Sequence, residues 1–259
     1  MKRAMLLASI SAGCLLACQA GAANSAQRVK AFARLPDWSG MWENAEDIRK
    51  VKFEPTPFNA EWQAKADAAR AGQSIRYYCA EGLPSMMEVP EQINMFEVIV
   101  APEAVFMNFT THEVRHIYTD GRGHPAKRDL LITPVGDSIG HWEGETLVVD
   151  TIGTRPLLLS VEVVEFNPGH PQPAAVKSVP ASNQLRFEER IRMINPNELE
   201  DRLTIYDPVA LTHPIHETIK YQRVKDLDRL IYDDCRENER NPVVDGRITT
   251  IDAAPPQKE

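Results

Sequence analysis

From residue 96 onward, short stretches of the chain alternate between apolar and polar residues, which is the pattern of β-strands with one buried face. The stretches are rich in aromatic and β-branched residues, and turn-forming residues separate them. They span residues 96–101, 104–110, 114–119, 138–142, 146–151, 185–193, 199–205, 215–224 and 227–235. Roughly eight to ten strands joined by short turns predict a mainly β domain built as an antiparallel meander. We expect a closed, lipocalin-like barrel rather than a sandwich, because closure removes exposed strand edges.

Two segments depart from this alternation. Residues 60–71 are rich in good helix formers, with Asn59 as a suitable N-cap and Gly72 directly after the run. They predict one N-terminal helix. Residues 153–182 contain many prolines and small residues, and they predict a loop that runs over the surface.

The first 23 residues have the features of a secretory signal peptide. Lys2 and Arg3 precede an apolar run over residues 5–17, and small residues follow it. This run is too short to span a bilayer and no later segment is long enough, so we expect no transmembrane span. The stretch LLAC, which ends at Cys18, resembles a lipobox. A lipid anchor at Cys18 is therefore the alternative to a cleaved, soluble form.

The chain is thus expected to have three parts. Residues 1–23 form the signal peptide, residues 24–240 a single β-rich domain, and residues 241–259 a flexible C-terminal tail. The leader predicts a periplasmic or secreted protein, with a membrane-anchored lipoprotein as the alternative.

The formal net charge of -8 narrows the classes of partner. An acidic chain has no electrostatic footprint for nucleic acid, so none is expected as a partner. No glycine-rich phosphate loop leads into a helix pattern, and we expect no cofactor. A small organic molecule is the expected partner, and another protein is the alternative.

Two cysteines, Cys79 and Cys235, remain once the leader is set aside. An exported protein meets an oxidising compartment, which favours a disulfide between them. Two separate buried thiols are the alternative.

His112, Glu113 and His116 spell the H-E-x-x-H pattern of zinc hydrolases. That pattern needs a helix, because only a helical turn brings both histidines to one metal ion. The flanking residues instead predict a strand, in which positions four apart are separated by about 13 Å at about 3.3 Å per residue. We therefore expect no metal site here, and a zinc hydrolase is the least favoured function.

The densest polar stretch contains Tyr118, Asp120, Arg122 and His124. Together these side chains could bind an anionic or hydroxylated ligand and move protons. The alternative is a turn that an Asp–Arg pair holds in place. Within the functional interpretation, Tyr118 and Arg122 bind the ligand, whereas Asp120 and His124 act as catalytic acid or base.

A second polar stretch combines Ser138, His141, Trp142 and Glu143. Alternation sends Ser138 and Trp142 to one face of the strand and His141 to the other, so a Ser-His nucleophile is not expected. We interpret Ser138 and Trp142 as ligand-binding residues, with Trp142 as a pocket wall or part of the core.

Glu189 occupies the apolar register of its strand, between Phe187 and Ile191. If that face lines the barrel interior, burial would raise the pKa of its carboxyl and suit it to acid-base catalysis. The alternative is an ion pair with an arginine from a neighbouring strand.

Several blocks, taken in order, resemble a large family of exported bacterial proteins of unknown function. The blocks are DWSGMW at 37–42, CAEGLP at 79–84, IYTDGRGHP at 117–125, SIGHWEG at 138–144, TLVVDT at 146–151, IYDP at 205–208 and CREN at 235–238. The resemblance implies no catalytic role, since no activity is established for that family. It does imply that Cys79 and Cys235 belong to the shared frame, and that His116 stands where relatives carry arginine. The chain departs from the usual pattern after Thr151.

The sequence therefore leaves three functional hypotheses. The first is an exported barrel that binds a small organic molecule and transforms it by acid-base chemistry, as a lyase, isomerase or hydrolase. The second is a non-catalytic envelope protein or lipoprotein that contacts other proteins. The third is the zinc hydrolase. For the first, the expected catalytic residues are Asp120, His124 and Glu189, and the expected ligand-binding residues are Tyr118, Arg122, Trp142 and Ser138.

Overall fold

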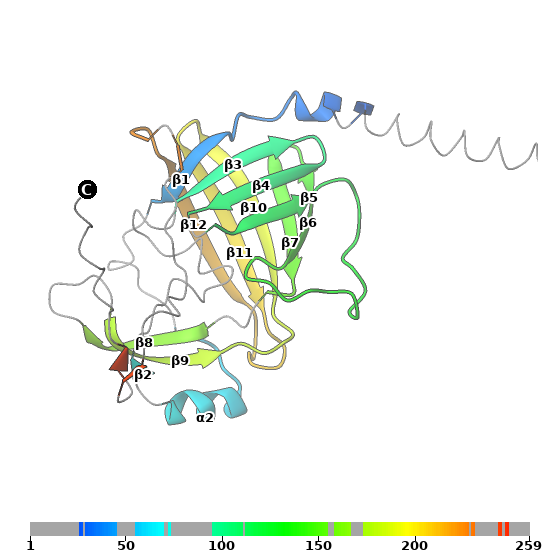
Figure 1. The fold of residues 1–259 in the computed structure, drawn as a ribbon. Helices are drawn as coiled ribbons and strands as arrows, with labels where there is room; N and C mark the ends of the chain where they lie inside the picture. The colour runs from blue at the N-terminus through cyan, green and yellow to red at the C-terminus, as the bar shows by residue number, and fades with distance from the viewer. Residues whose placement is uncertain are drawn as a thin grey trace, which may run out of the picture.

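Nine strands close into the predicted barrel in a computed structural model of the chain (Figure 1). The structure describes residues 26–27, 29–45, 55–69, 72–73, 95–110, 112–154, 158–166, 173–227, 229–230, 243–244 and 247–248. The barrel strands are β1 (Gly40–Asn44), β3 (Phe96–Ala101), β4 (Ala104–Phe109), β5 (Val114–Tyr118), β6 (Asp137–Glu143), β7 (Thr146–Ile152), β10 (Arg186–Asn195), β11 (Glu198–Tyr206) and β12 (Ile215–Arg223). Their order around the barrel is β1-β12-β11-β10-β7-β6-β5-β4-β3, and β3 returns to β1.

One neighbouring pair departs from the predicted antiparallel meander, because β5 and β6 run parallel. Strands in a closed antiparallel barrel must alternate in direction, which an odd number of strands cannot do all the way around. The parallel ladder is short, with Ile117 opposite Ser138 and Tyr118 opposite Ile139. The loop at 119–136 therefore leaves the barrel beside the point to which it returns.

Residues 153–182 were predicted to be a loop, and this prediction is wrong. β8 (Leu158–Phe166) and β9 (Pro173–Pro180) form a hairpin, which β2 (Gly72–Gln73) joins as a third strand. Prolines near both ends of the segment conceal its strands, because a proline is tolerated at the first residue or the edge of a sheet.

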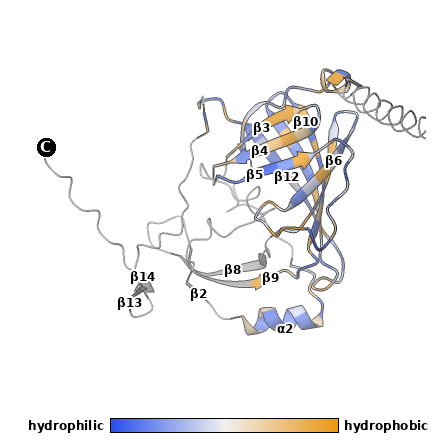
Figure 2. Cartoon of the chain, turned by 45° about the vertical axis from the view of Figure 1, so that its right-hand side comes forward, coloured by the Kyte–Doolittle hydropathy of each residue, from blue (hydrophilic) through white to orange (hydrophobic). Residues whose placement is uncertain are grey.

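The predicted helix is α2 (Ala60–Ala68), and it lies beside this small sheet in both views (Figures 1 and 2). The side chain of Asn59 accepts a hydrogen bond from the Trp62 N–H at 3.0 Å, as an N-cap does. The Trp62 indole in turn donates to the Pro180 carbonyl at 3.0 Å, which fixes the helix to β9.

Several predictions fall on parts of the chain outside the described residues. These are the leader at 1–23 with Cys18, and the pairing of Cys79 with Cys235, so all of them stay predictions. A last strand was predicted at 227–235. Of these residues the structure describes 227, 229 and 230, and they lie outside any strand. The short strands β13 (Val243–Val244) and β14 (Arg247–Ile248) pair within the segment predicted as a tail. In the described part of the chain, no helix is both long enough and apolar enough to cross a membrane.

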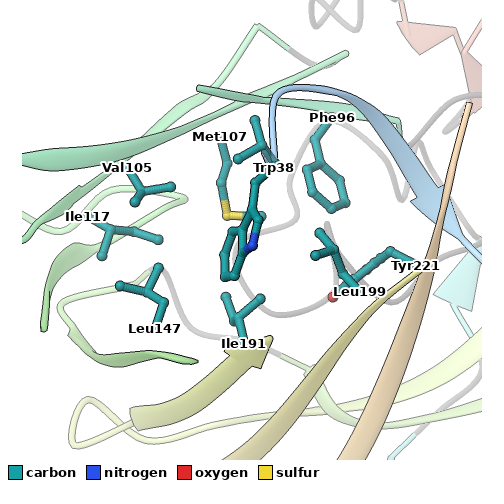
Figure 3. Close-up of a pocket in the computed structure, with 10 residues that line it drawn as sticks. Trp38, Phe96, Val105, Met107, Ile117, Leu147, Ile191, Leu199 and Tyr221 are labelled. Carbon is teal, nitrogen blue, oxygen red and sulfur yellow. The ribbon is translucent and has the colours of Figure 1, made fainter. Parts of the chain in front are cut away.

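The predicted alternation fills the inside of the barrel with apolar side chains, which makes the interior a packed core. Trp38, from the segment just before β1, lies in the middle of this core and is 2% exposed (Figure 3). A small pocket among these side chains has a volume of about 10 Å³, which is room for about one water molecule. The residues around it are Trp38, Phe96, Val98, Val105, Met107, Ile117, Leu147, Ile191, Leu199 and Tyr221.

Arg223 holds the turn that inserts Trp38 into the barrel. Its guanidinium donates hydrogen bonds to the carbonyls of Asp37, at 3.0 Å, and of Ser39. It also lies over the ring of Trp42, 4.3 Å from the ring centre. The Trp42 indole closes the turn by donating to the Trp38 carbonyl at 3.0 Å.

Candidate functional site

A polar cluster lies inside the barrel, centred on Arg115 of β5. Arg115 is 1% exposed, and its guanidinium binds both carboxylate oxygens of Glu189 on β10. It also donates to Ser138 on β6 at 3.0 Å and to Thr151 on β7 at 2.8 Å. Burial alone would lower the pKa of Arg115, but the charge of Glu189 and the hydrogen bonds to it raise the pKa above its ordinary value. The guanidinium thus links β5 to β6, β7 and β10 by hydrogen bonds, at the place where the β5–β6 ladder is short.

The predicted inward position of Glu189 is confirmed, since its residue is 3% exposed. Its arginine partner comes from β5, which is not a neighbour of β10 in the sheet. Both oxygens of the carboxylate contact the guanidinium, and a bidentate pair of this kind is a strong and directional contact. Glu189 is thus bound within the core, away from the polar stretch at 118–124.

Asp201 on β11 lies diagonally across from Glu189, because Ile191 pairs with Asp201 and Glu189 with Leu203. It is 1% exposed, and among the described residues no group forms a hydrogen bond of ordinary geometry with its carboxyl oxygens. Burial, together with the charge of Glu189, raises the pKa of Asp201 well above its usual range, although Arg115 opposes the shift. Asp201 is therefore a buried carboxylic acid that keeps its proton above the pH at which an exposed aspartate ionises.

This position of Asp201 predicts a specific dependence of stability on pH. The unfolded chain releases the proton near the ordinary pKa of 3.8, whereas the folded chain retains it until the raised pKa is reached. Between those two values the folded state holds more protons, so its stability falls by about 1.4 kcal/mol per pH unit as the pH rises. Asp201→Asn has no proton to lose, and we expect its stability relative to the native protein to increase with pH.

The measurement is urea unfolding of both proteins at about pH 5 and about pH 8. Asp226→Asn is a matched control at an exposed position. A stability difference between the native protein and Asp201→Asn that stays constant over this range would contradict the assignment.

Ser138 and Trp142 were predicted to bind the ligand, and both face the barrel interior. The Ser138 hydroxyl is occupied by Arg115 and by Thr151, whose hydroxyl lies at 2.8 Å. The ring of Trp142 packs edge-on against Trp38 with 5.1 Å between ring centres. His141 is exposed on the opposite face of β6, which confirms that Ser138 and His141 diverge.

The predicted polar stretch forms a group on the outside of the barrel. Arg122 donates to Asp120 at 2.6 Å, and its guanidinium lies 4.0 Å from the centre of the Tyr118 ring. The hydrogen bond from Arg122 holds the pKa of the Asp120 carboxyl below its ordinary value. Asp120 and Arg122 thus neutralise each other at the start of the loop at 119–136.

His124, from the same loop, lies between two carboxylates of neighbouring strands. Its Nδ1 is 2.5 Å from Asp137 on β6, and its Nε2 is 3.6 Å from Asp150 on β7. The imidazole is 16% exposed, whereas the two carboxylates are 25% and 29% exposed. Solvent therefore reaches the carboxylates more readily than the imidazole between them.

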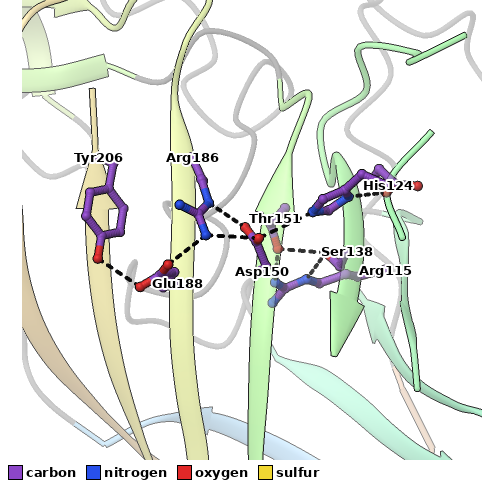
Figure 4. A network of polar contacts seen from close by, with 9 residues as sticks. Arg115, His124, Ser138, Asp150, Thr151, Arg186, Glu188 and Tyr206 are labelled. Carbon is purple, nitrogen blue, oxygen red and sulfur yellow. Dashed lines mark hydrogen bonds and ion pairs between the residues drawn. The ribbon is translucent and has the colours of Figure 1, made fainter. Parts of the chain in front are cut away.

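The network continues from Asp150 across two further strands (Figure 4). Arg186 on β10 donates to both oxygens of Asp150, at 2.8 and 3.0 Å, and to Glu188 at 2.7 Å. The hydroxyl of Tyr206 on β11 donates to the other oxygen of Glu188 at 2.8 Å. This hydrogen bond raises the pKa of the Tyr206 hydroxyl, because the neighbouring carboxylate would repel a phenolate.

These side chains meet because they occupy the outward register of adjacent strands. Asp150 pairs with Glu188, and Arg186 pairs with Tyr206. We call the whole group the outer polar strip. Its members are Tyr118, Asp120, Arg122, His124, Asp137, Asp150, Arg186, Glu188 and Tyr206.

Sequence reasoning found four members of the outer polar strip and missed the five from Asp137 onward. The signal for Asp150 and Glu188 is their outward register in two strands whose apolar positions alternate. That these two side chains belong to one network follows only when β7 and β10 are known to be neighbours in the barrel. The sequence does not show this, because 33 residues, which include β8 and β9, separate the two strands in the chain.

The H-E-x-x-H residues do not form the helix that zinc binding would need. His112 has a φ of 69° and is exposed, and His116 lies within β5, as the predicted strand requires. His116 lies on the outer face, edge-on to Phe106 and tilted against Tyr118, with ring centres 4.7 and 6.0 Å away. Within the described ranges, no group of three or more metal-binding side chains is placed to hold a metal ion.

Comparisons with protein family models, with curated proteins and with solved structures give no match for this chain. Its function therefore has to be argued from the geometry of the outer polar strip and of the interior cluster.

Proposed function

We propose that the protein binds a small organic molecule at the outer polar strip, and that the Asp137–His124–Asp150 group exchanges a proton with it. The observation that carries the proposal is the position of one imidazole between two partly exposed carboxylates. The pocket inside the barrel has room for about one water molecule, whereas the polar groups of the strip lie on the outer surface, where a ligand can reach them.

The chemistry follows from this arrangement. An exposed carboxylate can accept a proton from a bound molecule, and an adjacent imidazole can take that proton up and return it. Asp137 orients the ring through Nδ1, which leaves Nε2 directed toward Asp150. Proton transfer of this kind serves isomerases, lyases and hydrolases, and the strip supports that general class.

Export of the protein is part of the proposal, and it rests on the leader features of residues 1–23. The likeness to a family of exported bacterial proteins supports it as well. A ligand present in the same compartment as the exported protein would then reach the strip without crossing a membrane.

The proposal is tested with a matched pair of histidine variants, His124→Gln and His141→Gln. Both histidines lie on the outer surface near β6, but His141 is outside the strip and contacts Glu143. We would screen small organic compounds by ligand-observed NMR against the native protein and then against each variant. His124→Gln is expected to weaken binding by about 10- to 100-fold, as the loss of a charge-assisted hydrogen-bond network does.

His141→Gln is expected to bind as the native protein does. Compounds that bind equally well to His124→Gln and to the native protein would place the ligand site elsewhere. If no compound bound the native protein, small-molecule binding itself would lose its support.

A further inference from the structure

A surface groove of about 350 Å³ lies where the β10–β11 hairpin turns. Its wall includes Asn197 of the turn, Glu198 at the start of β11, and Gln222, Arg223 and Lys225 at or just after the end of β12. Glu198 pairs with Gln222, so the β11–β12 ladder holds the two sides of the wall together. Pockets for small ligands have volumes of about 300–1000 Å³, and the groove falls within this range.

The groove is separate from the outer polar strip. Arg186 and Tyr206 of the strip pair at the open end of the β10–β11 hairpin, whereas the groove lies at its turn. Strand β10 has 10 residues, which span about 30 Å at about 3.3 Å per residue. A small ligand in the groove therefore cannot reach the strip, and what it binds is independent of the proposed function.

The guanidinium of Arg223 is a fixed cation in the wall. It donates to the carbonyls of Pro196 at 2.8 Å, of Asp37 at 3.0 Å and of Ser39, and it lies over the Trp42 ring. A guanidinium has five N–H groups, so two remain after these three hydrogen bonds. No carboxylate of the described residues forms an ion pair with Arg223. The group is thus an oriented donor whose charge an acidic ligand can compensate.

Lys225 adds a second positive group to the wall. It is exposed, and it has no hydrogen bond or ion pair within the described part of the chain. Asp226 follows it and is exposed as well, but it is not part of the wall. Two cations therefore line the groove without a carboxylate partner, in a chain whose formal net charge is -8.

Three carboxylates at or beside the wall have partners of their own. Glu198 is 3.9 Å from the Lys220 ammonium. Glu43 accepts a hydrogen bond from Gln222 at 2.7 Å, and Asp37 accepts hydrogen bonds within its own turn. These groups therefore leave the charges of the two wall cations available to a ligand.

Two carboxamides of the wall have unused hydrogen-bonding capacity. The side chain of Asn197 forms no hydrogen bond with the described residues, and Gln222 uses one amide N–H on Glu43. A carboxamide donates through its NH₂ group and accepts through its oxygen. This combination matches hydroxyl groups, which also donate and accept.

We infer that the groove binds a small hydroxylated acid, such as a sugar acid. Its carboxylate accepts hydrogen bonds from Arg223 and Lys225, and its hydroxyl groups bond to the carboxamides of Asn197 and Gln222. A cation of the same size is repelled by both wall cations, and a neutral sugar keeps the hydrogen bonds but lacks the charge.

The test uses three probes built on one sugar ring, namely glucuronate, glucose and glucosamine. At about pH 6 the first is an anion, the second neutral and the third a cation. Protein labelled with ¹⁵N-tryptophan reports on binding through the indole signal of Trp42, which lies under the Arg223 guanidinium. Trp62, which belongs to α2, is the internal control.

Glucuronate is expected to shift the Trp42 signal and to leave the Trp62 signal unchanged, with a Kd of about 1 mM. We expect it to bind at least about fivefold more tightly than glucosamine, with glucose between them. Added salt should weaken the binding of glucuronate and leave that of glucose unchanged.

Variants of the wall separate its two functions. Lys225→Glu is expected to remove the preference for glucuronate over glucose, whereas Asn197→Ala should weaken the binding of both by the same factor. Lys127→Glu makes the same change of charge at an exposed position of the loop at 119–136, and it should bind as the native protein does. Arg223 is left in place because it holds the turn that inserts Trp38. Circular dichroism confirms that each variant is folded.

Three results would overturn the inference. The first is glucose or glucosamine that binds as tightly as glucuronate. The second is a Trp42 signal that glucuronate does not shift. The third is an equal loss of affinity in Lys225→Glu and Lys127→Glu, which would show that overall charge rather than the groove attracts the acid. None of these results bears on the outer polar strip, which the His124 variant tests separately.

Discussion

Replacing Arg115 by methionine is expected to remove about 3–5 kcal/mol from the free energy of unfolding, because it leaves the Glu189 carboxylate buried without its partner. Arg115 and Glu189 are each almost fully buried, so removing the guanidinium leaves the carboxylate in the core rather than in solvent. Two further hydrogen bonds, to Ser138 and Thr151, are lost in the same change. Unfolding in urea, followed by circular dichroism, measures the effect.

Two further variants show whether the loss of stability comes from leaving one buried charge without its partner. Arg190→Met removes an exposed ion pair with Glu143 and is expected to cost at most about 1 kcal/mol. The double variant Arg115→Met/Glu189→Met removes both charges, and we expect it to recover most of the lost stability. A loss below about 1 kcal/mol for Arg115→Met would mean that water or another group reaches Glu189.

Trp38→Ala is expected to lower the free energy of unfolding by a similar amount, about 3–5 kcal/mol, for a different physical reason. Its indole fills the centre of the barrel, and the surrounding strands hydrogen-bond to one another on all sides and cannot close around the space. The substitution therefore creates an apolar cavity. A cavity of this kind stays dry and accepts an apolar guest, so added indole should restore part of the lost stability.

Thermal unfolding with and without indole checks this expectation. Trp142→Ala is the matched control, because Trp142 contacts Trp38 but is only half-buried, and its loss should be smaller. If indole stabilised the native protein to the same extent, it would not be binding in the cavity. If Trp38→Ala unfolded at the same temperature as the native protein, the expected loss of stability would be contradicted.

The barrel could be predicted from the sequence because most of its strands bury one face and expose the other. In β7, for example, Leu147, Val149 and Thr151 face inward while Asp150 faces outward. Alternation of this kind is a local property that needs no knowledge of neighbours. The parallel pairing of β5 with β6 could not be predicted in this way, since direction depends on how the ring of strands closes.

The interior cluster could be predicted only in part. Glu189 lies between two inward apolar residues and was therefore placed inside, but Arg115 lies between Val114 and His116, both exposed. At that point the hydropathy pattern of β5 is inverted, with the valine outside and the arginine inside. The inversion is possible because the carboxylate of Glu189 compensates the buried guanidinium, and this partner is 74 positions away in the chain.

The outer polar strip was predicted where its members are neighbours in sequence and missed where they are neighbours in space. Tyr118, Asp120 and Arg122 are joined by local turn geometry, and the sequence predicts that geometry directly. Asp150 and Arg186 are 36 positions apart and meet only through the β7–β10 ladder. A single sequence contains no information about which outward side chains of distant strands share a row.

The double pairing of β1 has a consequence for the order in which the molecule assembles. β1 forms ladders with β3 and with β12, and Glu43 accepts a hydrogen bond from Gln222, 179 positions away. The first strand of the barrel in chain order therefore cannot complete its pairing until the last strand of the barrel has been synthesised. Contacts of such long sequence separation form slowly, and until the β1–β12 ladder forms, β1 and β12 present open edges to other chains. A chain that ends before residue 215 lacks β12 and would leave the edges of β1 and β11 open permanently. We therefore expect such fragments to aggregate under conditions in which the whole chain remains in solution.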